Sequence, residues 1–218
     1  MRSIQTVSMR IFQRTDYKWF IPLFCVTLII MLQSCTISFG IRSGYKKLSK
    51  TDREKIVFLD TNKDICDIKD CEKIYSITGK QLLNCIDTNE NVMVYFWKPY
   101  CTSEFCYLLT HVKKYCDSQD LVLYAVISEY YNLKRTFSEI EYISQPLFSI
   151  NEHYYQTQNQ QKFIKLFMSE LLQDEKLSNE IFWHTSFVFK NGKLIDSRIK
   201  MEDDNAGELK IFEFKPEN

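Results

Sequence analysis

Residues 91–97, Asn-Val-Met-Val-Tyr-Phe-Trp, are the stretch that decides the fold of this chain. The run is rich in β-branched and aromatic residues, which is the pattern of a strand buried on both faces of a sheet. Pro99 then marks a helix start, and apolar residues recur at helical spacing from Cys101 to Cys116. A second apolar run, at 121–127, follows. The sequence therefore predicts two parallel strands joined by a helix.

The chain beyond this unit predicts helices and then a hairpin. Amphipathic helical patterns cover residues 133–144 and 160–173, with a proline break between them. Two short apolar segments, at 185–189 and 193–199, flank the dipeptide Asn191-Gly192. Because Asn-Gly supplies the positive φ angles of a tight I′ turn, we expect these segments to pair as a hairpin.

The chain before this unit predicts strands at 55–60 and 73–78 and a short helix at 79–86. The expected fold class is therefore α/β, with a central mixed sheet flanked by helices in three layers. One domain, residues 55–218, would hold it, and a helical insertion would precede the C-terminal hairpin.

Composition is that of an ordinary globular protein. Of 218 residues, 45% are hydrophobic and 15% aromatic, and the chain holds only five Gly and four Pro. Lys plus Arg and Asp plus Glu are 28 each. Because a nucleic-acid-binding domain needs a positive balance, we expect no nucleic-acid partner.

The N-terminus has the pattern of an export signal. Four cations, Arg2, Arg10, Arg14 and Lys18, precede an uncharged run at residues 19–41, and Met9 is an alternative start. Leu32-Gln33-Ser34-Cys35 resembles the lipobox of bacterial lipoproteins, which implies that Cys35 receives lipid. We expect a signal at 1–35 and a mobile tether at 36–54. The protein would then be anchored in the cell envelope, facing the periplasm or the exterior.

A retained membrane helix is the alternative for the same segment. The 23 uncharged residues at 19–41 are long enough to span a bilayer. Cations also follow the run, so the distribution of charge does not fix its orientation. Either interpretation makes the membrane a partner.

Two motifs resemble the thioredoxin family. Tyr95-Phe96-Trp97-Lys98-Pro99-Tyr100-Cys101 is similar to the family's strand, Phe-Trp pair and nucleophilic cysteine, and residues 184–192 resemble the segment that ends in Phe-Lys-Asn-Gly. The resemblance implies a thioredoxin-like fold, with Cys101 as the nucleophile. A cysteine in the first turn of a helix would also gain thiolate stabilisation from the helix dipole.

The spacing of the cysteine pair departs from the family. Cys101 and Cys106 form a Cys-x4-Cys pattern instead of Cys-x-x-Cys. In one regular helix their α-carbons would lie roughly 8 to 9 Å apart, beyond the limit of about 7 Å for a disulfide. A bond between these cysteines therefore requires that the first helical turn be unwound.

Two other positions also depart from the family. His184 stands where the family has a cis-proline facing the cysteines, and Tyr95 stands where it has a buried aspartate. The second change removes the family's proton acceptor for the resolving thiol.

These patterns predict a cell-envelope thiol-disulfide oxidoreductase. Cys101 would attack a substrate disulfide, Cys106 would resolve the mixed disulfide, and His184 would flank the thiolate. The expected partners are protein thiols or disulfides and an unidentified electron donor, with neither a cofactor nor a metal.

Two alternatives remain open at this point. Residues 101–106 are also similar to the Cys-Thr-x-Glu-x-Cys of peroxiredoxin Q enzymes, which implies a thiol peroxidase with His184 in the place of an arginine. Those enzymes carry Thr or Ser where this chain has Lys98. The other alternative is a catalytically inactive thioredoxin-fold binding module, which the loss of proline and aspartate favours.

The remaining cysteines of the body are expected to be structural. Cys66 and Cys71 would form a bridge across a loop, with a resolving pair as the lesser alternative, while Cys85 and Cys116 would be small core residues. No histidine is near enough in sequence to indicate a zinc site.

Overall fold

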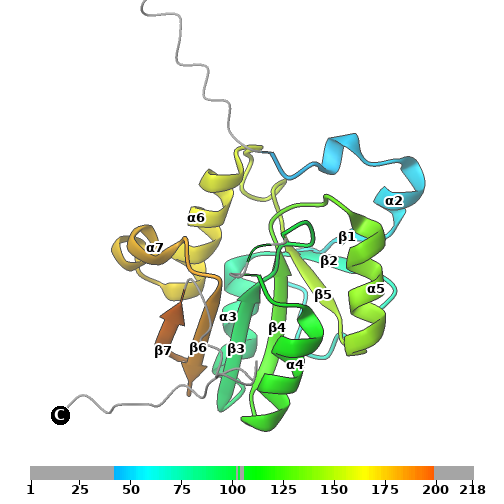
Figure 1. The fold of residues 1–218 in the computed structure, drawn as a ribbon. Helices are drawn as coiled ribbons and strands as arrows, with labels where there is room; N and C mark the ends of the chain where they lie inside the picture. Colours follow the sequence, from blue (N-terminus) through cyan, green and yellow to red (C-terminus); the bar gives the residue numbers. More distant parts are fainter. Residues whose placement is uncertain (1–41, 102, 104–105, 199–218) are drawn as a thin grey trace, which may run out of the picture. The chain divides into compact units, whose positions relative to one another are not determined.

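The computed structural model describes residues 42–101, 103 and 106–198 (Figure 1). The expected export signal, the expected lipidation site Cys35 and the C-terminal tail lie outside these residues. Within the described ranges, no helix has the length and apolar character needed to cross a membrane.

One mixed sheet of seven strands forms the centre of the domain, in the order β1-β2-β5-β4-β3-β6-β7. The strands are β1 Ile56–Phe58, β2 Ile74–Ile77, β3 Asn91–Phe96, β4 Val122–Ile127, β5 Leu147–Ile150, β6 Ser186–Lys190 and β7 Lys193–Arg198. The first five run parallel to their neighbours, whereas β6 is antiparallel to β3 and β7 is antiparallel to β6. The predicted α/β class with a mixed sheet is confirmed.

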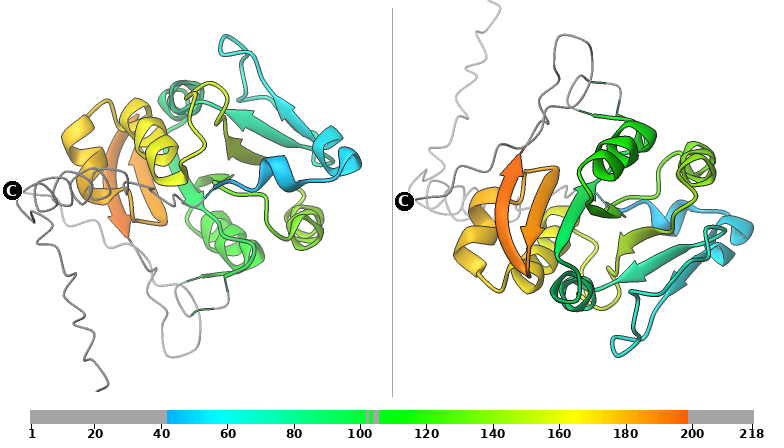
Figure 2. Two further views of the ribbon diagram at one scale, coloured as in Figure 1. Left: turned by 90° about the horizontal axis from the view of Figure 1, so that it is seen from above. Right: turned by 90° about the horizontal axis from the view of Figure 1, so that it is seen from below.

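Helices cover both faces of this sheet, as the two views in Figure 2 show. They are a 3-10 helix η1 Tyr45–Lys47 and the α-helices α2 Lys50–Glu54, α3 Gly79–Asp87, α4 Leu109–Ser118, α5 Leu133–Ile143, α6 Gln160–Leu172 and α7 Glu175–Ile181. Helices α3 and α6 pack on one face, and α4 and α5 pack on the other.

Strand β3 shows why two cores form. Its side chains alternate between the faces of the sheet, so Val92, Val94 and Phe96 enter the core under α3 and α6. Met93 and Tyr95 enter the core under α4 and α5, together with Trp97 just beyond the strand. The apolar character of both alternating sets explains why residues 91–97 read as a strand buried on both faces.

The local sequence signals account for most element boundaries. Thr78 and Gln81 form a capping box at the start of α3. The hairpin turn has φ angles of 48° at Asn191 and 77° at Gly192, as an Asn-Gly I′ turn requires. The expected strands at 55–60, 73–78, 91–97 and 121–127, the helices at 79–86, 133–144 and 160–173, and the hairpin are confirmed to within a few residues.

Three features differ from the sequence expectation. Strand β5 and helix α7 were not predicted, so the segment before the hairpin holds a strand as well as helices. The helix expected from Cys101 to Cys116 begins only at Leu109. Part of the expected tether, residues 45–54, forms η1 and α2, and the Tyr45 ring packs edge-on against Phe58 at 5.1 Å.

Candidate functional site

A disulfide joins Cys101 and Cys106 in the segment between β3 and α4, with their α-carbons 5.9 Å apart. Both cysteines are half-buried, so their sulfur atoms are not sealed in the core. The Cys101 amide donates to the Lys98 carbonyl at 3.1 Å, and the Cys106 amide donates to the Ser103 carbonyl at 3.1 Å. The Ser103 hydroxyl lies 3.3 Å from Cys101 Sγ and 3.7 Å from Cys106 Sγ. The bond therefore joins two half-buried residues.

The expected helix-dipole stabilisation of Cys101 is wrong. Helix α4 starts eight residues after Cys101, and Pro99 lies in a turn instead of starting a helix. The reason is the one the spacing anticipated: a regular helix would hold the two α-carbons too far apart for a disulfide. Residues 101–106 therefore cannot form a regular helix while Cys101 and Cys106 are bonded.

The cysteine segment lies at the carboxyl end of the parallel strands. It follows β3 directly, and the Trp97 amide donates to the Val126 carbonyl near the end of β4 at 2.8 Å. Open α/β sheets place their binding and reactive sites at this edge, because the loops that leave the strands converge there. The position favours a functional role for the pair.

Tyr95 is hydrogen-bonded to the backbone just after Cys106. Its side chain is buried, and its hydroxyl accepts a hydrogen bond from the Tyr107 amide at 3.3 Å. Burial raises the pKa of Tyr95 to about 12, so the phenol keeps its proton at neutral pH. Tyr95 therefore holds the backbone after Cys106 and does not replace a carboxylate as a proton acceptor.

A buried carboxyl group, Glu129, lies beside the cysteine segment. Glu129 is 1% exposed and follows β4. Its Oε2 accepts a hydrogen bond from Gln160 Nε2 at 3.3 Å, while Oε1 is buried without a hydrogen-bond partner among the described residues. Burial raises the pKa of Glu129. Burial and this carboxylate raise the pKa of Tyr100, the residue before Cys101, to about 12. The sequence analysis did not identify Glu129.

An aromatic pair connects the cysteine segment to the start of the domain. The rings of Tyr100 and Tyr131 meet edge to face, with centroids 6.2 Å apart. The Tyr131 hydroxyl donates to the Arg42 carbonyl at 3.2 Å, and the Tyr130 amide donates to the Ser43 carbonyl at 2.7 Å. The first described residues of the chain therefore lie close to the disulfide.

His184 lies at the same end of the sheet, and its described contacts are with Ile181, Phe187 and Ser197. The Thr185 carbonyl accepts from the Phe96 amide at 2.7 Å, which places His184 near the end of β3. Its Nδ1 lies 2.8 Å from Ser197 Oγ on β7. Burial lowers the pKa of His184, so the ring is neutral at pH 7.

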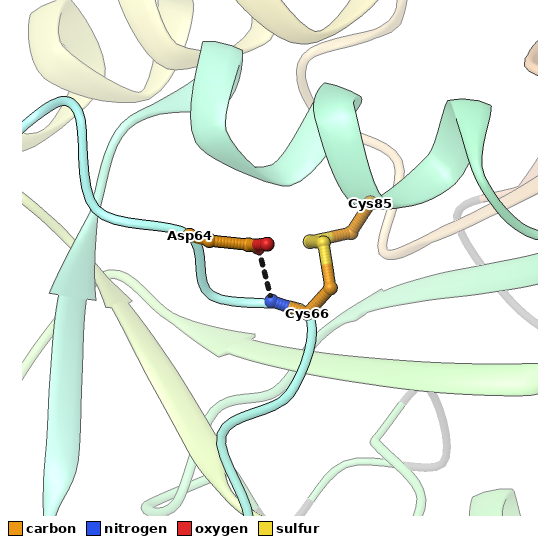
Figure 3. A group of neighbouring side chains, drawn as sticks. All are labelled: Asp64, Cys66 and Cys85. Atoms are coloured by element: carbon orange, nitrogen blue, oxygen red, sulfur yellow. Dashed lines mark hydrogen bonds between the residues drawn. A yellow bond between two sulfur atoms is a disulfide. The ribbon is translucent and has the colours of Figure 1, made fainter.

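A second disulfide joins Cys66 to Cys85, with α-carbons 5.3 Å apart (Figure 3). The predicted bridge between Cys66 and Cys71 is wrong, because Cys71 is a free thiol. Cys85 is buried in the core as expected, but its sulfur is bonded. Helix α3 points Cys85 at the preceding loop, and that arrangement follows from tertiary packing, which the spacing of cysteines does not reveal.

Asp64 completes a group of possible metal ligands with this second disulfide. Its Oδ1 accepts from the Cys66 amide at 2.9 Å, and its carboxylate and the two sulfur atoms lie within 4.8 Å of one another (Figure 3). Zinc binds cysteine as the thiolate, and two cysteines joined in a disulfide have no thiolate to offer. While the disulfide is formed, it links the loop at Cys66 covalently to helix α3.

A cavity of about 350 Å³ lies next to Cys66, lined also by Val122 and Leu123 at the start of β4. The cysteine pair at 101 and 106 follows the opposite, carboxyl end of the strands. The cavity is therefore separate from the candidate site.

Cys116 has the core position that the sequence predicts. Cys116 is buried, with its Sγ 3.4 Å from Met93 Sδ, and burial raises its pKa to about 12, which confirms a core role. His111 and His153 are exposed, and the His153 ring stacks on Phe58 at 4.1 Å.

Comparison with known proteins adds no assignment: no family model matches the sequence, and neither a curated protein nor a solved structure matches the chain.

Proposed function

We propose that the chain is a membrane-anchored thiol-disulfide oxidoreductase of the bacterial cell envelope. The observation that supports it best is the Cys101–Cys106 bond, half-buried in a short segment at the carboxyl edge of the parallel strands. Structural disulfides in a compact domain are usually sequestered, whereas a disulfide that exchanges must be reached by an attacking thiolate.

The proposed cycle moves two electrons. In the reduced enzyme, the Cys101 thiolate attacks a disulfide of a protein substrate and releases one substrate thiolate, which takes a proton from water. Cys106 then loses its proton and attacks the mixed disulfide, which forms the Cys101–Cys106 bond and releases the second substrate thiol. A dithiol electron donor returns the pair to the reduced state by the same exchange in reverse.

The order of elements is consistent with a thioredoxin-like fold, which is part of the proposal. Strand β3 leads to the cysteines, helix α4 and strand β4 follow, and an antiparallel hairpin of β6 and β7 ends the described fold. The two motifs that resemble the family lie on β3 and on the hairpin, which pair directly.

Two side chains near the pair have proposed supporting roles. Glu129 places a carboxyl group beside Tyr100, and a negative charge near a thiol disfavours its thiolate. We expect Glu129 to take the proton that Cys106 loses and to give it to the substrate thiolate that leaves in the second step. His184 is neutral and near the end of β3, where its ring would flank an extended substrate.

The anchored location rests on residues outside the described ranges. Cys35 is the proposed lipid site, and mass spectrometry of the N-terminal peptide from membranes tests it. A peptide that begins at a diacylglyceryl-modified Cys35 is expected. An unmodified peptide that continues through residues 19–41 would favour the retained helix instead.

Substitution of Cys101 tests the enzymatic claim. Cys101→Ser should abolish reduction of a protein disulfide by the full-length chain supplied with dithiol, because it removes the thiolate that attacks the substrate. Cys71→Ser removes a free, half-buried thiol and should leave turnover unchanged. If the Cys101→Ser protein turns over as fast as wild type, the oxidoreductase proposal is wrong.

The same assays separate the two alternatives. A peroxiredoxin Q-like peroxidase would consume hydroperoxide rapidly through Cys101 and would show no preference for protein disulfides. The spacing of Cys101 and Cys106 favours this candidate. In peroxiredoxin Q enzymes the first cysteine also bonds to a cysteine five positions later, once the helix that carries them has unwound. An inactive binding module would retain its partner in the Cys101→Ser variant.

A further inference from the structure

The described chain begins with a strongly basic stretch, residues 42–55, which we call the basic segment. It holds six exposed cations, Arg42, Lys46, Lys47, Lys50, Arg53 and Lys55. Only two acids accompany them, Asp52 and Glu54, which leaves a net charge of +4. The whole chain, by contrast, has a formal net charge of zero.

The basic segment is fixed to the domain. The Ser43 and Arg42 carbonyls accept hydrogen bonds from Tyr130 and Tyr131. Arg53 Nη2 donates to the Lys46 carbonyl at 2.7 Å. Its cations are therefore presented from defined positions.

Three of these cations converge on one place. Arg42, Lys46 and Lys47 line a single hollow of about 50 Å³. Glu152 also lines it, but this carboxyl group is 4% exposed and leaves the exposed charge positive. Lys and Arg bind phosphate oxygens by charge and hydrogen bonding, so the exposed cations around this hollow are suited to an anionic surface.

The length of chain before the basic segment limits its distance from the membrane. Arg42 is seven positions after Cys35, and an extended chain spans at most about 3.6 Å per position, or roughly 25 Å in all. With a retained helix at 19–41, Arg42 would follow the membrane span directly. Both forms of anchor bring the cations within reach of the lipid headgroups.

We propose that the basic segment docks on anionic lipid headgroups of the membrane that carries the anchor. Tyr131 contacts both Arg42 and Tyr100, so docking holds the Cys101–Cys106 segment near the membrane surface. The protein substrates would then be membrane proteins with cysteines close to the bilayer. The inference rests on the anchored location in the proposed function and does not require redox activity.

Chemical labelling of lysines in reconstituted vesicles tests the docking. Full-length protein is placed in phosphatidylcholine vesicles with or without phosphatidylglycerol and treated with a water-soluble acylating reagent. We expect Lys46, Lys47 and Lys50 to react several-fold more slowly when the anionic lipid is present. The exposed Lys176 and Lys190, on α7 and at the end of β6, should react equally in both. At about 1 M salt, where charge interactions extend only about 3 Å, the difference should vanish.

A charge-reversal pair provides the matched variant. Arg42→Glu with Arg53→Glu reduces the net charge of the basic segment from +4 to zero and keeps the lysine reporters. The lipid-dependent protection should disappear in this variant and persist in Lys176→Glu with Lys190→Glu. Equal labelling of Lys46, Lys47 and Lys50 in both vesicle types would overturn the docking. A chain that fails to join vesicles at all would overturn the docking and the anchored location together, while the disulfide assay remains independent of either result.

Discussion

Glu129 illustrates how a single residue is understood only in the folded chain. In the sequence it is one acid after an apolar run, which is typical of a strand end. Its significance comes from Tyr100 and Gln160, which lie 29 positions before it and 31 positions after it. Polar residues at the carboxyl end of a predicted parallel strand are the signal that would have identified it as a candidate.

Replacement of Glu129 by glutamine should stabilise the fold at neutral pH. Burial raises the pKa of Glu129, so the native state binds its proton more tightly than the unfolded chain, whose Glu has a pKa of about 4.3. Stability is therefore lost as the pH rises from that value through the folded pKa. Glu129→Gln should melt a few degrees higher than wild type at pH 8.

The advantage of Glu129→Gln should disappear near pH 4, where the carboxyl group is protonated in both states. Thermal unfolding across this pH range measures the effect. Glu141→Gln, at an exposed position on α5, should leave the melting temperature unchanged at every pH. A Glu129→Gln protein that is less stable than wild type at pH 8 would show that the hydrogen bonds to the carboxylate outweigh the cost of burying its charge.

At the scale of elements, the sequence identified those with strong periodicity. Residues 91–97, 133–144 and 160–173 each carry a pattern long enough to define a strand or a helix, and each is confirmed. Strand β5 has only four residues after Pro146, which is too short for its periodicity to stand out. Its place between β2 and β4 is set by pairing with distant strands.

The late start of α4 has a covalent cause. Residues at helical spacing after Cys101 predicted a helix, but the bond to Cys106 holds the two α-carbons 5.9 Å apart. The residue before α4, Leu108, has extended backbone angles of −64° and 143°. Side-chain periodicity alone does not report this constraint.

The Cys66–Cys85 disulfide should stabilise α3 without taking part in the chemistry. The two cysteines are 19 positions apart in the sequence, so the bond closes a loop of about that length. A loop of this length contributes about 3 kcal/mol by restricting the unfolded chain. Cys66→Ser with Cys85→Ser should lower the free energy of unfolding by about that amount, as measured with urea.

Turnover by this double variant should survive at temperatures where it is folded, because the cysteines at 101 and 106 remain. The single substitution Cys71→Ser, which breaks no bond, serves as the stability control. Loss of activity in a folded Cys66→Ser and Cys85→Ser protein would place the second disulfide in the reaction path.

The whole molecule brings three features to the carboxyl end of the parallel strands. The Cys101–Cys106 bond, the buried Glu129 and the first residues of the basic segment meet there through Tyr100 and Tyr131. The cysteines and the cations are visible in the sequence. Their proximity is not, because it depends on the loop after β4 contacting both the loop after β3 and the start of the domain.

The order in which the two disulfides open tests the central claim most directly. The full-length chain is purified without reductant and titrated with dithiothreitol, and free thiols are alkylated and mapped by mass spectrometry. The Cys101–Cys106 bond should open first, because both cysteines are half-buried, whereas Cys85 is fully buried. The Cys66–Cys85 bond should persist until the protein unfolds. Unpaired Cys101 and Cys106 in the purified protein, or a bond between them that resists dithiothreitol as long as Cys66–Cys85 does, would contradict the account.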